Sequence, residues 1–337
     1  MNYILKVCSK NALGLCAMLA AVILVAGCGS GSKSTLAANQ SPSASPTSPA
    51  PGPSPTPGPS PTPGPSPSPT PSGPPGAQRG KVVVVLEENH SYASVIGSSA
   101  MPYLNSLATQ YGLATQYYAD THPSIGNYFM LTAGQIITND DSYMSTVSAD
   151  NIVRHLLTGG KTWKSYAESI PSVGYTGGDT SLYVRHHNPM SYFSDVVNSN
   201  VQKMNLVPFT QFATDLSANQ LPDFSFVVPN LQDDAHDGSL AQADAWLKSN
   251  IAPLIANAQF QQNGLLIIVF DEGDASDGAH GGGRIAMVAV GPAVKHGFQS
   301  TTLYQHENLL KTIANYLGID ANIGNAAGAA PMTDLIP

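Results

Sequence analysis

The stretch "KVVVVLEEN" (Lys81–Asn89) decides the fold, because a run of branched apolar residues ends abruptly in two acids and an amide. Continuous apolarity without alternation is typical of a strand buried on both faces, as in a parallel sheet. Three further runs have the same character: "FSFVVPN" (Phe224–Asn230), "LLIIVFDE" (Leu265–Glu272) and "IAMVAVGP" (Ile285–Pro292).

Helical periodicity separates these runs. Strands that alternate with helices predict a three-layer α/β sandwich with a mostly parallel central sheet. In the segment 238–255, Ser239 or Asp237 is the expected cap and Pro253 the expected interruption. The other two helices are expected at 101–112, with Leu104, Leu107, Ala108 and Tyr111 on one face, and at 306–318, with Leu309, Leu310, Ile313 and Leu317 on one face and Gly318 as a stop.

The first 78 residues are unlike the rest. Two lysines precede an apolar run, Ala12 to Ala26, that ends in "LVAGC" at Cys28, which predicts a lipoprotein signal peptide over residues 1–28. About 15 apolar residues are too few to span a bilayer. Residues 29–78 are mainly Pro, Ser, Thr and Gly with a repeated "PGPSPT", which predicts a disordered tether. We therefore expect a lipid on Cys28.

Residues 79–337 form the predicted catalytic domain, and their length fits one α/β domain. The chain carries 22 acidic and 14 basic residues, and all the acids lie in this domain. Nucleic acid is therefore not an expected partner. The other two cysteines, Cys8 and Cys16, lie in the signal peptide, which excludes disulfide and thiol chemistry from the domain. The domain is expected to be a monomer.

Acidic and amide side chains follow three of the four predicted strands. Ligands collect at the carboxyl ends of strands in such sheets. The group comprises Glu88, Asn89, Asp234, His236, Asp271 and Glu272. So many carboxylates repel one another unless a cation neutralises them, and mixed O/N donors suit Ca²⁺, Mg²⁺, Mn²⁺ or Zn²⁺. A divalent metal site is the simplest interpretation, and solvated strand ends are the alternative. No EF-hand, zincin, Walker A or G-x-S-x-G pattern occurs in the domain.

Ser124 lies in "THPSIGNYFMLTAGQ" (Thr121–Gln135), where a short turn enters an apolar segment. One interpretation is an ordinary helix N-cap. The other is a nucleophile that a nearby metal activates, with Asn127 donating to a phosphoryl oxygen and the helix N-terminus favouring phosphate. The residues alone leave both open.

The Gly-rich loop "DASDGAHGGGR" (Asp274–Arg284) allows close approach of a phosphate to His280 and Arg284, or it is a flexible surface loop. His306 begins a helix as a cap, a ligand or a general acid. His236, His280 and His306 are all candidates for protonating a leaving group. The remaining histidines, including the pair His186 and His187, are interpreted as structural or exposed.

Four segments taken together resemble the phosphoesterase family of bacterial phospholipase C and acid phosphatases, a branch of the alkaline phosphatase superfamily. "LEENHSY" is similar to its Glu-Asn-His-Ser-aromatic motif and "HPSIGNYFMLTAG" to its His-Pro-Ser-x-Pro-Asn-Tyr motif. "PNLQDDAHDGS" resembles its Asp-Met-His-Asp-Gly segment, and "VFDEGD" its second metal-binding turn. "YQHENLLKTIANYLG" is a weaker fifth match.

The resemblance implies an alkaline phosphatase-like core and a divalent metal bound by Glu88, Asn89, Ser124, Asp271 and Glu272, with Ser124 as the nucleophile. It also implies that Asp234, His236 and His280 line the phosphate or bind a second ion. Two positions depart from the family pattern. Gly126 replaces a proline, which loosens the turn, and Ala235 replaces a methionine beside His236.

We therefore predict a metal-dependent phosphoric ester hydrolase, an acid phosphatase-like monoesterase that forms a phosphoserine. A phospholipase C-type phosphodiesterase and a non-catalytic surface-binding module on the same fold are the alternatives. The predicted location is the cell envelope, with the domain held outside the cytoplasm by a lipid in a bacterial membrane.

Overall fold

The computed structural model describes residues 80–337. The predicted lipidation site at Cys28, the signal peptide and the tether lie outside the described residues. No helix within residues 80–337 is both long enough and apolar enough to cross a membrane.

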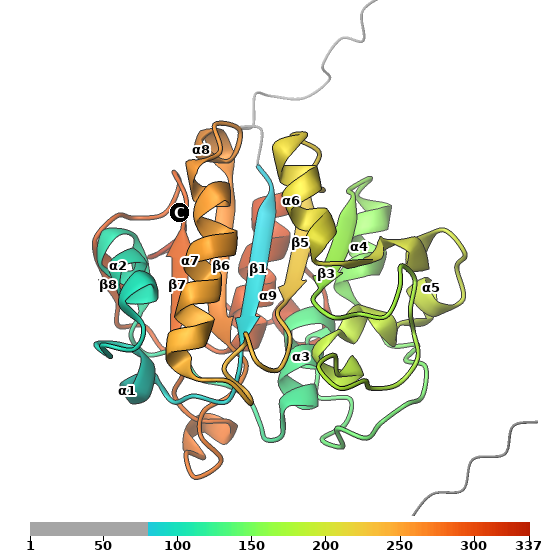
Figure 1. The fold of residues 1–337 in the computed structure, drawn as a ribbon, viewed down its shortest axis with the longest axis horizontal. Helices are drawn as coiled ribbons and strands as arrows, with labels where there is room; N and C mark the ends of the chain where they lie inside the picture. The colour runs from blue at the N-terminus through green and yellow to red at the C-terminus, as the bar shows by residue number, and fades with distance from the viewer. Residues whose placement is uncertain (1–79) are drawn as a thin grey trace, which may run out of the picture. The chain divides into compact units, whose positions relative to one another are not determined.

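One eight-stranded sheet forms the centre of the described domain, and helices cover both of its faces (Figure 1). The strand order is β4-β3-β5-β1-β6-β7-β2-β8. The strands are β1 (Val82–Glu87), β2 (Gly112–Ala114), β3 (Trp163–Ala167), β4 (Leu206–Pro208), β5 (Phe224–Val228), β6 (Leu265–Phe270), β7 (Met287–Val290) and β8 (Phe298–Ser300).

The sheet is mostly parallel, as the apolar runs predict. β5, β1 and β6 are parallel neighbours, so their carboxyl ends meet at one edge. The fourth predicted run contains β7, which pairs antiparallel with both β6 and β2. A parallel return needs a crossover of a dozen or more residues, usually a helix. The link from β6 to β7 has only a short 3-10 turn, Ala279–Gly281, so β7 runs back beside β6.

The predicted helices are present, and two of their details differ. α7 (Leu240–Ala256) is capped by the Ser239 side chain and continues past Pro253. Pro253 is exposed while Ile251 and Leu254 are buried, so packing on the inner face outweighs the lost backbone hydrogen bond. α2 (Pro102–Gln110) ends before Tyr111.

The two faces of the sheet carry different helices. α7 and α2 contact each other in front of the sheet in Figure 1, and α9 (His306–Leu317), which contacts α3 (Ser124–Ala133), lies behind it. The buried face of α9 contains Leu309, Leu310, Ile313 and Leu317, and Gly318 ends the helix in the left-handed conformation. The remaining helices are α1 (Tyr92–Val95), α4 (Ile152–Thr158), α5 (Ser194–Val197), α6 (Thr210–Ser217) and α8 (Phe260–Asn263).

Candidate active site

Buried carboxylates gather where β5, β1 and β6 end. Glu88 follows β1, Asp271 follows β6, and Asp234 lies in the loop after β5; each is at most 1 % exposed. Backbone hydrogen bonds hold these segments together: Glu88 N donates to Asp234 O (2.8 Å) and Asp271 N donates to Glu87 O (2.9 Å). The parallel register of three neighbouring strands thus brings acids that are far apart in sequence to one point.

Ser124, at the start of α3, lies against this cluster. It is the first residue of α3, Pro123 occupies the N-cap position, and no side chain caps the helix. Ser124 Oγ lies 3.3 Å from Glu88 Oε2 and 3.4 Å from Glu272 Oε1. The hydroxyl therefore points into the acids, and Ser124 is not the N-cap that one sequence interpretation allowed.

The N-terminus of α3 is already partly used. Ile125 N donates to Asp141 Oδ1 (3.1 Å), and Gly126 N makes a long contact with Pro123 O (3.4 Å). A phosphate at this helix end competes with Asp141 for the first backbone N–H. The helix end is consequently less available to an anion than the sequence suggests.

Asn127 holds the turn on which Ser124 lies. Its Oδ1 accepts from Asp120 N (2.9 Å) and Thr121 N (3.2 Å), and its Nδ2 donates to Thr121 O (2.8 Å). A longer contact of 3.5 Å joins Nδ2 to Glu272 Oε2. The amide is committed to the turn, so its observed contacts position Ser124.

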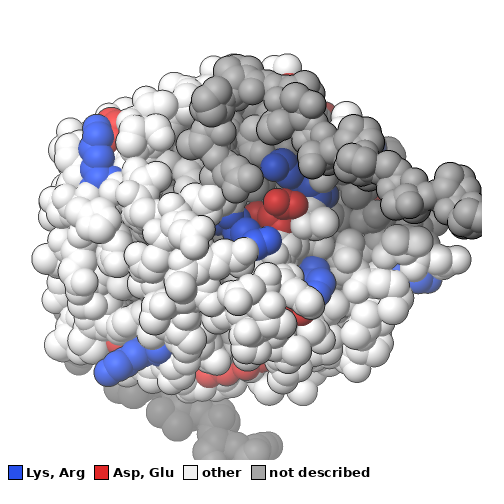
Figure 2. Space-filling model, turned by 90° about the horizontal axis from the view of Figure 1, so that it is seen from above, with Lys and Arg blue, Asp and Glu red and all other residues white. Residues whose placement is uncertain are grey.

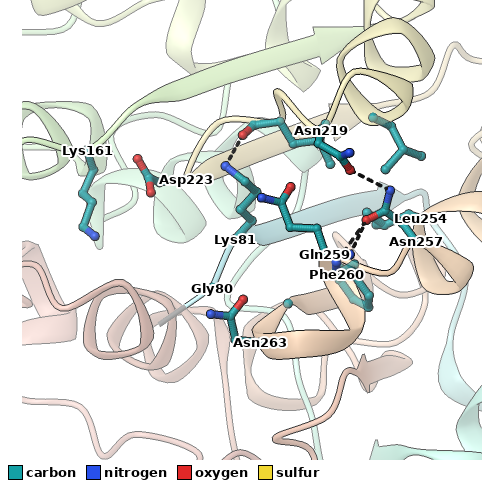
Figure 3. Close-up of a pocket in the computed structure, with 13 residues that line it drawn as sticks. Gly80, Lys81, Lys161, Asn219, Asp223, Leu254, Asn257, Gln259, Phe260 and Asn263 are labelled. Atoms are coloured by element: carbon teal, nitrogen blue, oxygen red, sulfur yellow. Dashed lines mark hydrogen bonds between the residues drawn. The ribbon is translucent and has the colours of Figure 1, made fainter. Parts of the chain in front are cut away.

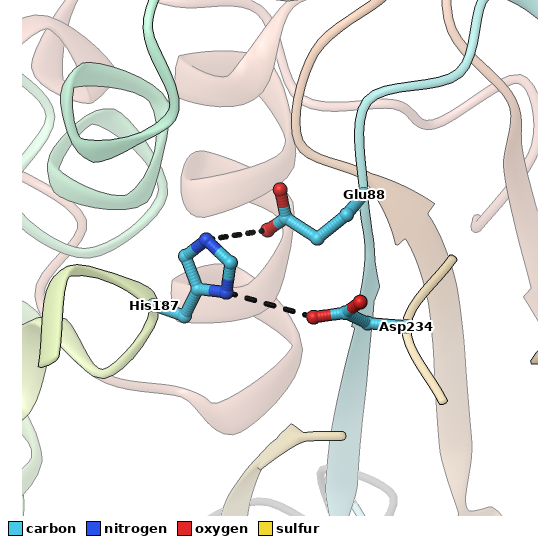
Figure 4. A group of neighbouring side chains, drawn as sticks. All are labelled: Glu88, His187 and Asp234. Atoms are coloured by element: carbon cyan, nitrogen blue, oxygen red, sulfur yellow. Dashed lines mark ion pairs between the residues drawn. The ribbon is translucent and has the colours of Figure 1, made fainter. Parts of the chain in front are cut away.

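His187 joins the acid cluster, although its sequence context predicted a structural or exposed side chain. Its Nε2 lies 3.4 Å from Glu88 Oε1 and its Nδ1 lies 3.6 Å from Asp234 Oδ2 (Figure 4). Its ring stacks on Tyr128, with 5.1 Å between centroids, and Tyr128 donates to Glu88. Burial, and secondly His236, lower the pKa of His187 to about 3, so the ring is neutral and suited to bind a cation.

The residues fit a divalent ion. One ligand atom each from Glu88, His187 and Asp234 lies within 4.8 Å of the others. Hydrogen-bond partners within the described residues are lacking for four buried atoms around this point: Asn89 Oδ1, Asp271 Oδ2, Asp234 Oδ2 and His187 Nε2. Buried polar atoms of this kind are rare unless something else satisfies them. A hard cation with oxygen and imidazole ligands does so.

Electrostatics lead to the same conclusion. Burial raises the pKa of Glu88 well above its usual value, and Asp271 and then Asp234 add to the shift. Burial, and next Asp271, raise the pKa of Glu272 to about 9, and burial raises that of Asp234 to about 7. Among residues 80–337, no lysine or arginine forms an ion pair with these acids. These buried acids therefore either stay protonated or share a bound cation that neutralises their charge.

Two histidines contact residues of the acid cluster: His122 contacts Glu272, and His306 contacts Asp271. His122 Nδ1 lies 2.8 Å from Glu272 Oε2, and its Nε2 lies 3.0 Å from Asp277 O. His306 is fully buried between Tyr117 Oη (3.0 Å) and Asp271 O (2.7 Å), and burial lowers its pKa to about 4. His306 therefore fixes the chain at Asp271 and is enclosed on both ring nitrogens.

The other sequence candidates lie further out. His236 is exposed beside His187, with 5.9 Å between ring centroids, and its Nδ1 pairs with Asp237 Oδ1 at 2.8 Å. The exposed ring of His280 packs against Tyr118 at 4.2 Å. Arg284 lies over the ring of Tyr92 and donates to Thr115 O.

Gly126, which stands in place of the family's proline, lies in a closely packed turn and not in the loosened turn that the sequence suggests. A Cβ at this position would lie 2.3 Å from Asn139 Oδ1 and 2.4 Å from Thr121 Cγ2, so close packing fixes the turn. We expect Gly126→Ala to lower the free energy of unfolding by about 1–3 kcal/mol, because an inserted methyl overpacks the turn. Chemical denaturation measures this loss. Unchanged stability together with unchanged kcat would contradict the tight fit. Gly278→Ala is the control, because no atom lies within 4 Å of the added Cβ and φ is −94°.

A separate hollow of about 340 Å³ lies at the other edge of the sheet, where β1 begins (Figure 3). Lys81, Lys161 and Asp223 are among its lining residues. Figure 2 looks onto this end of the domain and shows basic side chains interspersed with acidic ones. None of the carboxylates of the candidate site lines this hollow.

The chain is similar in sequence to proteins that are named as phosphatases. Residues 98–320 match the profile described as "Phosphoesterase family". The chain is 37 % identical over 256 residues to a protein of Mycobacterium tuberculosis called phosphatidylinositol-3-phosphatase, covering 75 % of this chain and 82 % of that protein. It is 32 % identical over 247 residues to a probable acid phosphatase of Kluyveromyces lactis, covering 71 % of this chain and 58 % of the yeast protein.

Solved structures are similar in fold. The lipoteichoic acid synthase LtaP from Listeria monocytogenes gives a TM-score of 0.55 at 11 % identity, covering 73 % of this chain and 74 % of that one. A protein in the alkaline phosphatase superfamily from Vibrio parahaemolyticus gives 0.51 at 13 % identity, covering 74 % and 70 %. At this level of identity the likeness concerns the arrangement of the sheet and helices.

Proposed function

The chain belongs to the phosphoesterase family and is a hydrolase of phosphoric esters, and from this premise we propose that it is a metal-dependent phosphomonoesterase with Ser124 as its nucleophile. The observation that carries the proposal is the position of Ser124 Oγ, 3.3 Å from Glu88 and 3.4 Å from Glu272 within a buried acid cluster. An isolated serine hydroxyl is a weak nucleophile, so this environment needs an explanation.

Glu88, Asn89, Asp271 and Glu272, with Ser124, would hold a divalent cation, and Asp234 with His187 extends the ligand set toward a second position. A bound cation supplies positive charge that favours the ionised serine and neutralises the phosphate oxygens. Ca²⁺, Mg²⁺, Mn²⁺ and Zn²⁺ all suit this mixture of donors.

The chain's own groups perform the transfer in two displacements. Ser124 Oγ forms a bond to phosphorus as the ester P–O bond breaks, and Glu272, 3.4 Å away, would take the serine proton once a bound cation keeps its carboxylate ionised. His236, which is exposed beside His187, supplies a proton to the leaving oxygen. Water then attacks phosphorus on the side opposite Ser124 Oγ, the Oγ–P bond breaks, Oγ regains a proton in place of the one that water gives up, and inorganic phosphate leaves. Asn127 keeps the turn in line throughout.

Similarity to proteins named as phosphatases supports a monoester substrate. We expect hydrolysis of p-nitrophenyl phosphate at least tenfold faster than that of bis-p-nitrophenyl phosphate. Release of p-nitrophenol with each added divalent ion measures both. Faster cleavage of the diester, or of phosphatidylcholine, would favour the phospholipase C-type alternative. Absence of both bound metal and hydrolysis would favour a non-catalytic binding module.

A lipid phosphomonoester belongs in the same substrate panel. Ile136 and Met144 are 42 % and 51 % exposed on the loop after α3, whose Asp141 bonds to Ile125 next to the nucleophile. Apolar side chains beside a phosphate site suit a substrate with acyl chains. Phosphatidylinositol 3-phosphate in mixed micelles, compared with a soluble inositol phosphate, tests for this preference.

The proposal includes a lipid anchor on Cys28, a monomeric state, and a position outside the cytoplasm in the cell envelope. The sequence pattern around Cys28 is its support. Loss of metabolic fatty-acid labelling in Cys28→Ser is the measurement that tests the anchor.

A further inference from the structure

Three segments converge on Asp120, which lies just before the nucleophile turn. Asp120 Oδ1 accepts from Gln305 Nε2 (3.3 Å), and Asp120 Oδ2 makes a long contact with His306 N (3.4 Å) at the start of α9. Gln305 Nε2 also reaches Ala119 O (3.4 Å) and His280 O (3.1 Å). One side chain thus connects the first turn of α9, the Gly-rich loop and the strand-end segment that leads to Ser124.

The Gly-rich loop packs directly on this segment. A Cβ at Gly281 would lie 2.0 Å from Asp120 O, and a Cβ at Gly282 would lie 2.3 Å from Thr121 O. Gly282 N donates to Ala119 O (3.1 Å) and Ala119 N donates to Gly283 O (2.9 Å). Movement of Asp120 therefore shifts both the loop and the turn.

The backbone of Asp120 is hydrogen-bonded directly to Asn127, which holds the turn that carries Ser124. Its N–H donates to Asn127 Oδ1, the amide that also bonds to Thr121 and approaches Glu272. Asp120 itself contacts none of the proposed metal ligands in these hydrogen bonds. Its influence on Ser124 passes through Asn127 and the turn.

A second acid faces the Asp120 carboxyl. Glu307 lies in the first turn of α9, and its Oε2 is buried with no hydrogen-bond donor among the described residues. Burial first, and then the neighbouring Glu307 carboxyl with which it forms a side-chain hydrogen bond, raise the pKa of Asp120 to about 8. Two carboxyl groups in contact are satisfied only when a proton lies between them.

Other titratable groups around the pair do not replace that proton. His306 is buried and neutral, since its pKa is lowered to about 4, and only its backbone N–H faces Asp120. Burial, and secondly Asp120, raise the pKa of Tyr117, so it stays uncharged. His280 contributes its carbonyl to Gln305 while its ring lies against Tyr118. No lysine or arginine in residues 80–337 forms an ion pair with Asp120 or Glu307.

We propose that Asp120 and Glu307 share one proton, and that this shared proton holds α9 and the Gly-rich loop against the turn that carries Ser124. Asp120 is then a positioning residue for the hydrolysis, and its effect on activity rests on the proposed function. Loss of the proton leaves two negative charges in contact, which separates α9 from the turn.

The direction of the pH effect follows from linkage. The folded pair holds its proton up to about pH 8, whereas an unfolded aspartate releases it near its ordinary pKa of about 4. The stabilisation is complete below about pH 4, decreases as the pH rises, and is lost above about pH 8. The enzyme is thereby set to lose alignment of Ser124 under alkaline conditions.

The test compares wild type with Glu307→Gln and Asp120→Asn in the full chain, with Asp320→Asn as control, because the side chain of Asp320 is 61 % exposed. Each isosteric amide removes one charge and keeps a hydrogen-bonding group. The melting temperature from pH 5 to pH 9.5 is measured for all four proteins. We expect the melting temperature of wild type and of the control to fall by several degrees more across this range than that of the two variants, since the other buried acids, such as Asp234 and Glu272, titrate in all four proteins.

Hydrolysis of p-nitrophenyl phosphate gives the second readout. The alkaline fall in kcat should move upward by about one pH unit in Glu307→Gln and Asp120→Asn, and remain in place in Asp320→Asn. Equal melting differences from wild type at pH 5 and pH 9, together with an unmoved alkaline fall, would overturn the shared proton and leave a purely structural contact. If the protein hydrolyses no ester, the proposed function fails while the melting curves still decide the proton.

Discussion

Ser124→Ala is expected to abolish the phosphoenzyme and to lower kcat by about three orders of magnitude or more, because it removes the serine hydroxyl that lies against Glu88 and Glu272. The fold should survive, since the contacts of Ser124 Oγ with Glu88 and Glu272 are long, at 3.3 and 3.4 Å. Rapid acid quench with labelled substrate, followed by mass spectrometry of the peptide containing residue 124, measures the intermediate.

Ser249→Ala is the matched control. Ser249 is exposed on α7 and its hydroxyl bonds only to Ala245 O of the preceding turn. Its removal should leave turnover and the phosphoenzyme unaltered. Near-normal turnover in Ser124→Ala would assign the first displacement to another group. If turnover is lost while the metal content of Ser124→Ala equals that of wild type, the loss comes from the missing nucleophile and not from a missing ion.

Chelation of divalent ions should eliminate hydrolysis, and adding back the correct ion should restore it. The physical reason is the acid cluster: Glu88, Asp271 and Glu272 have raised pKa values through burial, and no lysine or arginine of the described domain forms an ion pair with them. An ion at 100 times its Kd adds about 2.7 kcal/mol to the free energy of unfolding, so the melting temperature should rise by several degrees.

Asp271→Asn should lower the metal content and remove this thermal shift, because it takes one charge from the ligand set. Asp274→Asn is the control, since Asp274 is exposed three residues further along the same segment. Metal analysis of the purified proteins and calorimetry with and without chelator measure both effects. Full activity in the chelated wild type, with no metal detected, would exclude the metal-dependent mechanism.

Much of the fold was predictable because apolar runs report burial directly. The runs beginning at Lys81, Phe224 and Leu265 became β1, β5 and β6, and the polar residues at their ends came together as expected. The direction of β7 was not readable from its composition, because a strand buried on both faces has the same residues in either orientation. The short strands β2, β4 and β8 span only three residues each and leave no periodic signal.

The site was predictable only where local sequence fixes a residue to a strand end or a helix start. Glu88, Asp271 and Asp234 follow from the parallel sheet, and Ser124 follows from the turn before α3. His187 lies about a hundred residues from Glu88 and ends a short 3-10 helix, Arg185–His187, that has no periodic signal, so tertiary packing, including its stacking on Tyr128, brings it to the acids. The adjacent pair His186-His187 is visible in the sequence, but the sequence does not show which of the two rings faces the acids.

The sequence by itself determined the strand ends and therefore the acid cluster, because strand burial and chain direction are encoded within each segment. Tertiary structure alone decided how that cluster is enclosed: Asn127 holds the turn, His122 pairs with Glu272, and Asp120 meets Glu307 beneath the Gly-rich loop. These contacts join segments 7 to about 190 residues apart in the chain, and no local pattern specifies which side chains meet when loops pack over the edge of a sheet.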